Sequence, residues 1–170
     1  VARQYQAHGA TTYLSDLKVD GIKEDTELGE IRKLDATDEE QIKQYFNWFA
    51  DENISIDIVI NCVGSAPDTH KHGQPAINNT FEDFMNPLRT SLASQFVTAK
   101  GAYLIMKEQG NGVIIFISST LSKVGCPWCP GLTAAHAGTE GLMRSLANEW
   151  GPEGIRVLGG RSEAMVDTAT

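Results

Sequence analysis

The stretch GVIIFISS at residues 112–119 decides the fold class. Five consecutive apolar residues, most of them β-branched, follow a glycine-rich turn at 110–112 and end at two serines. An uninterrupted apolar run is typical of a strand that helices cover on both faces, as in a parallel sheet. The run IVINCVG at residues 58–64 has the same character before its turn. We therefore expect two buried strands of a parallel sheet.

Helical patterns accompany these strands. A helix is predicted to begin at Thr37, because Thr37 and Glu40 have the spacing of a capping box and apolar residues follow at helical intervals. Residues 81–103 keep one apolar face, although Pro87 is expected to kink or restart that helix. A third amphipathic pattern covers residues 132–150.

Shorter strands are expected at 11–14, 31–34 and 155–158. The resulting alternation of strands and helices predicts an α/β protein with a doubly wound parallel sheet of Rossmann-like type, with helices on both faces. The length of 170 residues fits a single domain.

Composition and charge exclude several classes of protein. Hydrophobic residues make up 41% and charged residues 21%, which is close to the average for globular domains. The net charge of −8 lacks the basic surface that nucleic acids require. No stretch approaches the ~20 apolar residues of a membrane helix, and the first ten residues do not have the pattern of a signal peptide. We therefore expect a cytoplasmic protein without a nucleic-acid or membrane partner.

Two of the three cysteines stand in the motif Cys126-Pro127-Trp128-Cys129. Three interpretations stay open: a redox pair, two ligands of a zinc ion, or a rigid apolar wall of a substrate pocket. A redox motif of thioredoxin type would place a helix directly after the first cysteine, and here residues 130–131 intervene. A zinc site would need further ligands, for which His70, His72 or His136 are available at a spacing that matches no standard site. We therefore predict no metal ion in this protein.

Ligands of doubly wound sheets bind beyond the carboxyl ends of the strands. In this sequence those ends carry Asp16, Asp35, the turn at 61–64 and the serines at 118–119. These residues are therefore the predicted ligand site.

The chain resembles the short-chain dehydrogenase/reductase family over nearly its whole length. The motifs that carry the resemblance are Asp16 after a strand, LDATD at 34–38, NCVG at 61–64, ISS at 117–119 and EGLMRSLANEWGPEGIRV at 140–157. The resemblance implies a partial dinucleotide-binding domain at residues 1–170, because the family's first strand and Gly-rich turn are absent and the chain is truncated at both ends. At 160–164, GRSEA replaces the family's Pro-Gly turn.

The resemblance implies NAD as the cofactor. Asp16 would accept hydrogen bonds from the ribose hydroxyls and repel a 2′-phosphate, which disfavours NADP. Asp35 would face the adenine, or it would cap the helix that follows, and Gly64 would let the ribose approach the backbone. The full set of implied cofactor contacts is Asp16, Leu17, Asp35, Ala36, Asn61, Val63, Gly64, Ile117 and His136.

The catalytic pattern of the family is largely replaced. Members bind the substrate oxygen with a serine and use a tyrosine as the general acid/base, with a lysine that lowers the pKa of the tyrosine. Ser119 matches the serine, but Leu132 stands at the tyrosine position and His136 at the lysine position. Ser91 aligns with the family's catalytic asparagine. Ser119, His136 and Ser91 are therefore the predicted catalytic residues, with His136 or a water as proton relay.

By resemblance, the protein is an NAD-dependent oxidoreductase with a degenerate active site that acts on a carbonyl/alcohol pair in a small molecule. Two alternatives stay open: a catalytically silent subunit that serves binding or oligomerisation, and a cofactor-free lyase, dehalogenase or isomerase on the same fold. Two long helices pair across dimer interfaces in the family. The matching segments here are 84–107 and 133–149, so a homodimer or homotetramer is expected.

Overall fold

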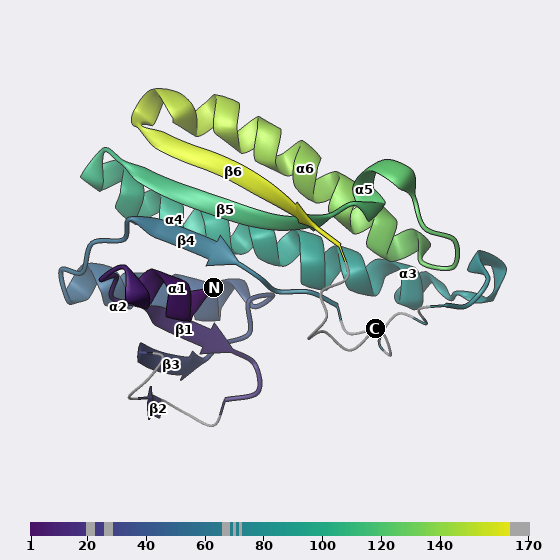
Figure 1. Ribbon diagram of the computed structural model, residues 1–170, viewed down its shortest axis with the longest axis horizontal. Coiled ribbons are helices and arrows are strands. Elements are labelled where there is room, and N and C mark those ends of the chain that lie inside the picture. The colour runs from purple at the N-terminus through teal and green to yellow at the C-terminus, as the bar shows by residue number, and fades with distance from the viewer. Residues whose placement is uncertain (20–22, 26–28, 66–68, 70, 72, 164–170) are drawn as a thin grey trace.

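The computed structural model describes residues 1–19, 23–25, 29–65, 69, 71 and 73–163. Within them, six strands form two three-stranded sheets (Figure 1). In the first sheet, β3 (Gly29–Lys33) pairs in parallel with β1 (Tyr13–Asp16) and antiparallel with β2 (Lys23–Asp25). The second sheet is wholly parallel, and its order is β4 (Ile58–Asn61), β5 (Gly112–Ser119) and β6 (Ile155–Ser162). The predicted α/β class is confirmed.

The division into two sheets follows from the strand order. In a doubly wound sheet of this type, another strand lies between the positions that β1 and β4 hold here. None of the described residues occupies that place. The antiparallel strand β2 was not predicted, because residues 17–29 are polar and have no apolar periodicity.

Helices link the strands and cover the second sheet from one side. In Figure 1, α2, α4 and α6 lie behind the strands, whereas α1 lies in front of β1. The helices are, in chain order, α1 (Ala2–Ala7), α2 (Glu39–Asp51), α3 (Phe81–Pro87), α4 (Ser94–Gln109), α5 (Leu121–Val124) and α6 (Pro130–Trp150).

Helix α2 starts later than the predicted capping box would place it. Its N-cap is Asp38, whose Oδ1 accepts hydrogen bonds from the backbone N–H groups of Glu40 at 3.0 Å and Gln41 at 3.1 Å. Thr37 instead donates its hydroxyl to Asp35 Oδ1 at 2.7 Å. A carboxylate is a good N-cap because it also interacts favourably with the helix dipole. The N-cap is therefore Asp38 and not the predicted Thr37.

The helix around Pro87 widens rather than breaks. Pro87 ends α3, a π-helical segment follows at Leu88–Ala93, and α4 continues from Ser94. Proline supplies no backbone N–H, so the regular hydrogen-bond ladder cannot pass through it unchanged. The predicted irregularity is confirmed. It places Ser91 in the π-helical segment, and such segments are frequent at functional sites.

One hydrophobic core joins the two sheets. It includes Phe46 of α2, Ala102 of α4 and Phe116 of β5, all of them buried. The two helices approach closely at Gly101, where a Cβ atom would lie 2.3 Å from the Phe46 ring. Glycine at this position therefore lets α2 and α4 pack together and hold the two halves as one unit.

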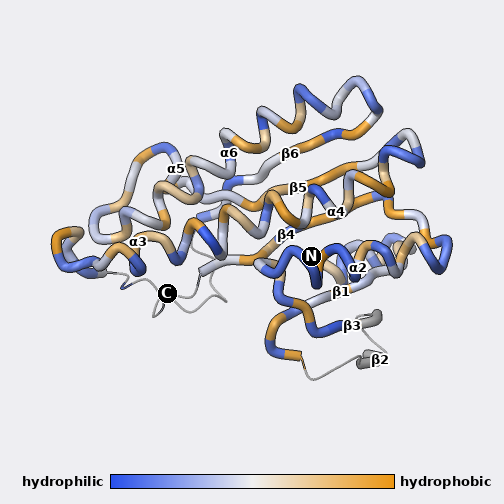
Figure 2. Tube along the Cα trace, turned by 180° about the vertical axis from the view of Figure 1, so that it is seen from behind, coloured by the Kyte–Doolittle hydropathy of each residue, from blue (hydrophilic) through white to orange (hydrophobic). Residues whose placement is uncertain are grey.

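The predicted Rossmann-like fold is confirmed, and among the described residues α4 and α6 cover one face of β5 more fully than its other face is covered. Ile114 and Phe116 of β5 are buried on the face toward α4 and α6, but Ile115 and Ile117 on the opposite face are only half-buried. Ile58 of β4 is 40% exposed. Figure 2 shows the hydrophobic character along β4 and β5. An apolar run indicates that both faces of a strand favour burial. It does not determine whether helices cover the second face.

Candidate functional site

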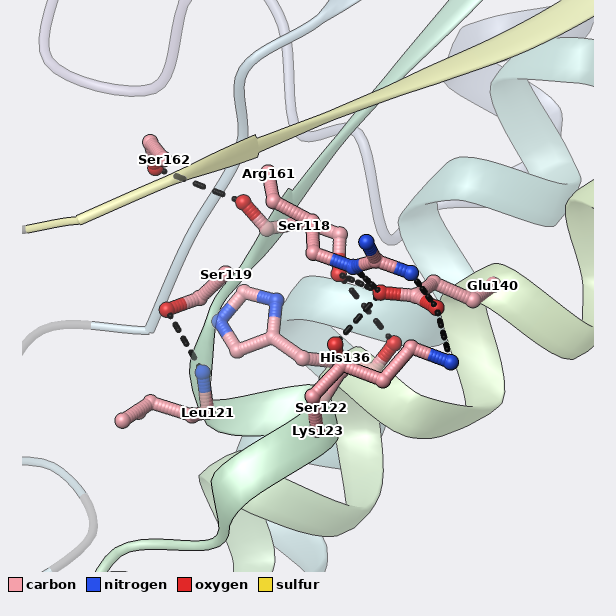
Figure 3. A network of polar contacts seen from close by, with 9 residues as sticks. All are labelled: Ser118, Ser119, Leu121, Ser122, Lys123, His136, Glu140, Arg161 and Ser162. Carbon is pink, nitrogen blue, oxygen red and sulfur yellow. Dashed lines mark hydrogen bonds and ion pairs between the residues drawn. The ribbon is translucent and has the colours of Figure 1, made fainter.

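Two predicted catalytic residues lie on neighbouring elements, Ser119 at the end of β5 and His136 on α6. Figure 3 shows both side chains at this end of β5. Side chains alternate along a strand, so Ser118 faces α6 and is buried, whereas its neighbour Ser119 is half-buried. The Ser119 hydroxyl accepts a hydrogen bond from the backbone N–H of Leu121 at 3.3 Å. Its own proton can still be donated to a ligand oxygen.

His136 lies in the second turn of α6 and is half-buried. Burial lowers the pKa of its imidazole below 6.5, and the opposing effect of the nearby Glu140 carboxylate is smaller. The ring is therefore neutral near pH 7. Its buried Nδ1 has no hydrogen-bond partner among the described residues. A neutral imidazole can transfer one proton, but it cannot provide the permanent cation that a lysine would.

Glu140 organises the site, and sequence reasoning missed it. Its carboxylate accepts two hydrogen bonds from Arg161, at 2.6 and 2.8 Å, and one from the Ser122 hydroxyl. Ser118 Oγ lies 3.4 Å from the same carboxylate, and the Lys123 ammonium lies 3.6 Å away (Figure 3). The hydrogen bonds from Arg161, followed by that from Ser122, hold the pKa of Glu140 well below its ordinary value of 4.5.

The Glu140 cluster connects four elements, and one of them is α5, which carries Ser122 and Lys123. Arg161 belongs to the end of β6, Ser118 to β5, and Glu140 to α6 one turn after His136. Ser118 Oγ also donates to the backbone carbonyl of His136 at 3.3 Å. A pocket of about 200 Å³ adjoins the cluster, lined by Phe116, Ser118, Thr139, Glu140, Met143, Arg144, Gly159, Gly160 and Arg161. The only sequence signal was the unusual GRSEA stretch at 160–164, of which residue 164 lies outside the described residues.

Asn61 fixes the turn after β4. It is buried, and its amide donates to the Ser94 carbonyl and to Thr98 Oγ1, each at 3.0 Å. Its Oδ1 accepts from the backbone N–H of Val63 at 2.9 Å. These contacts leave Val63 and Gly64 exposed, and a Cβ atom at Gly64 would meet nothing within 4 Å. The space beside the Gly64 backbone is therefore open.

Ser91 serves the same turn from the π-helical segment. Its buried hydroxyl accepts a hydrogen bond from the backbone N–H of Ser65 at 3.1 Å. The structure therefore gives Ser91 an anchoring contact, and its catalytic role stays a prediction.

Of the other predicted cofactor residues, Ile117 lies in β5 of the second sheet, whereas Asp16 and Leu17 lie at the first sheet. Asp16 ends β1, and its Oδ1 accepts from the Lys18 backbone N–H at 2.8 Å. It lines a cleft of about 500 Å³ with Leu14, Ser15, Lys18, Val19 and Ile31. Leu17 is 57% exposed beside it. These residues are on the sheet that is not hydrogen-bonded to β4–β6.

Asp35 does not cap α2, whose N-cap is Asp38, but holds the turn before it. Its Oδ1 accepts from both the backbone N–H of Thr37, at 2.9 Å, and the Thr37 hydroxyl. The contact holds the turn that includes Ala36, just before α2. An additional role toward adenine stays a prediction.

The structure offers no grouping of three or more potential metal-ligating side chains among the residues that it describes. His70 and His72, two of the candidate zinc ligands, lie outside those residues. No helix in the described ranges combines the length and apolarity that a membrane span needs.

The chain is similar to a known protein family and to several known proteins. The family model described as "Enoyl-(Acyl carrier protein) reductase" matches residues 1–159. The 3alpha-hydroxysteroid dehydrogenase of Mediterraneibacter gnavus is 34% identical over 121 residues, which are 71% of this chain and 46% of that protein. The chain spans about half the length of the curated relatives it matches.

Solved structures are similar as well. A putative gluconate dehydrogenase from Agrobacterium tumefaciens superimposes with a TM-score of 0.72 and 27% identity, covering 79% of this chain and 51% of that one. A short-chain dehydrogenase from Streptomyces avermitilis has a TM-score of 0.84 at 21% identity, covering 96% and 61%. The second likeness concerns the fold alone.

Proposed function

Because the chain belongs to the short-chain dehydrogenase/reductase family, we propose that it is part of an NAD-dependent oxidoreductase that acts on a carbonyl/alcohol pair in a small molecule. The observation that carries the proposal is the position of Ser119 and His136 on two adjoining elements at the carboxyl end of β5, where ligands of such sheets bind. The proton path differs from that of the family, because Leu132 cannot exchange a proton.

The residues of this chain divide the work as follows. Ser119 donates its hydroxyl proton to the substrate oxygen and so orients the carbonyl. His136, neutral at pH 7, passes a proton between that oxygen and solvent. Its unpartnered Nδ1 gains a hydrogen-bond partner when a polar group enters the site. The bound nicotinamide would supply the hydride chemistry.

The described residues fit a dinucleotide at two places. The Asp16 carboxylate lines the 500 Å³ cleft and has acceptor capacity beyond the contact with Lys18, so it can bind the ribose hydroxyls. The open space beside Gly64 admits a ribose close to the backbone. The negative charge of Asp16 favours NAD over NADP, because a 2′-phosphate would be repelled.

The first test is a calorimetric titration of the chain with NADH and with NADPH. We expect NADH to bind more tightly than NADPH. Asp16→Ala should weaken NADH binding about 10-fold or more, since it removes charge-assisted hydrogen bonds. Thr11→Ala is the control, because Thr11 is exposed and precedes β1. The thermal unfolding of all three proteins should be alike.

The outcomes separate the candidate functions. Tight NADH binding that Asp16→Ala weakens supports the oxidoreductase, and His136→Ala should then reduce turnover in a screen of carbonyl substrates that follows nicotinamide absorbance. A cooperatively folded chain that binds neither nucleotide would sink the NAD proposal and favour a cofactor-free lyase, dehalogenase or isomerase.

A silent binding or oligomerising subunit is the second candidate. Leu132 and neutral His136 replace the family's proton-transfer pair, and α4 leaves Phe96 45% and Leu104 59% exposed. Such apolar side chains on a long helix suit a self-complementary interface. Light scattering after size exclusion should give a dimer or tetramer that Leu104→Glu dissociates. A monomer at all concentrations contradicts this second candidate.

A further inference from the structure

The segment Cys126–Cys129 forms a tight turn between α5 and α6. Trp128 adopts a left-handed backbone conformation with φ of 67°, which reverses the chain just before Cys129 caps α6. As a result, Cys129 Sγ lies 3.5 Å from the carbonyl oxygen of Cys126 and 3.7 Å from that of Pro127. The second cysteine is folded back onto the first.

The two thiols differ in exposure. Cys126 is half-buried, whereas Cys129 is 2% exposed. Burial and the neighbouring Cys126 thiol raise the pKa of Cys129 to about 11. The Cys129 thiol therefore stays protonated at neutral pH, and Cys126 is the one that an external reagent reaches first.

We propose that Cys126 and Cys129 are a dithiol site that is converted reversibly to an intramolecular disulfide by a small-molecule disulfide such as oxidised glutathione. The turn brings together two cysteines three residues apart, and both are free thiols. The site is separate from the hydride chemistry proposed above and requires no nucleotide.

The exchange proceeds in two steps. The Cys126 thiolate attacks one sulfur of the small disulfide, forms a mixed disulfide and expels the first small thiol. Cys129, after giving up its proton, attacks Cys126 Sγ and expels the second small thiol. The protein pair loses two electrons, the small disulfide gains them, and the two cysteine protons end on the two released thiols.

The turn is coupled to neighbouring elements. The Trp128 carbonyl accepts a hydrogen bond from the Gly73 backbone N–H at 3.2 Å, and the Cys129 carbonyl accepts one from Thr133 at 3.1 Å. Thr133 belongs to the first turn of α6, and His136 follows one turn later. Closing the disulfide therefore constrains the end of α6 that carries the candidate active site.

The test equilibrates the intact chain in glutathione buffers of graded redox ratio, followed by acid quenching, alkylation and mass spectrometry. We expect two of the three cysteines to become protected together, with a mass loss of two hydrogens. Peptide mapping should link Cys126 to Cys129, and reductant should reverse the change. Cys126→Ser and Cys129→Ser should each abolish the link, while Cys62→Ser should leave its midpoint unchanged.

Other results would overturn the proposal. They are three fully alkylated thiols in the most oxidising buffer, a lasting glutathione adduct on Cys126, or a disulfide that involves Cys62 or a second chain. Serine is a favoured N-cap residue, so Cys129→Ser should keep the fold, and Cys126→Ser provides an independent check. Because the readout is thiol chemistry, it is independent of whether the oxidoreductase proposal holds.

Discussion

Glu140 is the residue with most of the polar contacts around the candidate active site. Its side chain is 9% exposed and receives hydrogen bonds from Arg161 and Ser122. A buried carboxylate is costly without such partners, and with them it fixes the ends of β5 and β6 against α6. Ser118 Oγ connects it to the backbone carbonyl of His136, and burial lowers the pKa of that imidazole more than the charge of Glu140 raises it.

Replacing Glu140 with glutamine should destabilise the chain by about 1–3 kcal/mol, because the charge-assisted hydrogen bonds from Arg161 are lost. The folded-state pKa of Glu140 lies below 4.5, so its contribution is fully present above pH 4.5 and falls as the pH drops toward the folded value. Urea unfolding at pH 7 and pH 4 should therefore show a smaller variant effect at pH 4.

Lys123→Gln is the matched control for this prediction. Lys123 reaches the same carboxylate from 3.6 Å but is 58% exposed, so solvent screens the pair and little stability should be lost. Equal effects of the two substitutions, or a Glu140→Gln effect that does not change with pH, would contradict the role assigned to the carboxylate.

Helix α6 contains glycines of two kinds. Gly131, at its N-terminal end, lies against α3, where a Cβ atom would be 2.5 Å from the backbone oxygen of Phe84. Gly141, in the middle, has only the Arg144 side chain at 4.0 Å. A backbone atom cannot move aside as a flexible side chain can. Gly131 is therefore needed for helix packing, whereas Gly141 is not.

The two glycines should therefore respond in opposite ways to alanine. Gly131→Ala should lower the free energy of unfolding by about 1–3 kcal/mol through the clash with Phe84. Gly141→Ala should raise it by about 0.5–1 kcal/mol, because alanine favours the helix. Urea unfolding of both variants measures the two changes in the free energy of unfolding. A stabilising Gly131→Ala would refute the close α3–α6 packing.

At the scale of the whole molecule, the two sheets are unequally supported. β5 has a strand on each side and its inward residues are buried, whereas β2 has three residues and one neighbouring strand. The halves meet mainly through α2 and α4, where Gly101 approaches Phe46 and Lys100 pairs with Glu39 at 2.6 Å.

Hydrogen exchange should reveal this inequality. The backbone amides of residues 114–116 in β5 should exchange most slowly, at rates set by global unfolding, and those of 23–25 in β2 among the fastest of the strand amides. Exchange followed by mass spectrometry or NMR tests the order. Equal protection of β2 and β5 would show that the two sheets open only together.

The sequence predicted more of the fold than of the site. The apolar runs at 58–60 and 113–117 are strands, and the irregularity at Pro87 is present, because these features depend on local periodicity and on the missing proline N–H. Ser119 and His136, the predicted catalytic residues, both lie at the candidate site, on β5 and α6. Their catalytic roles stay a prediction.

By itself, the sequence determined the α/β class and the family, since these depend on residue types and their spacing. Only the tertiary structure decided that Glu140 joins Arg161 from 21 residues away, that burial lowers the pKa of His136, and that one face of β5 stays half-exposed. Such properties depend on burial and on contacts between distant elements, which local patterns do not encode.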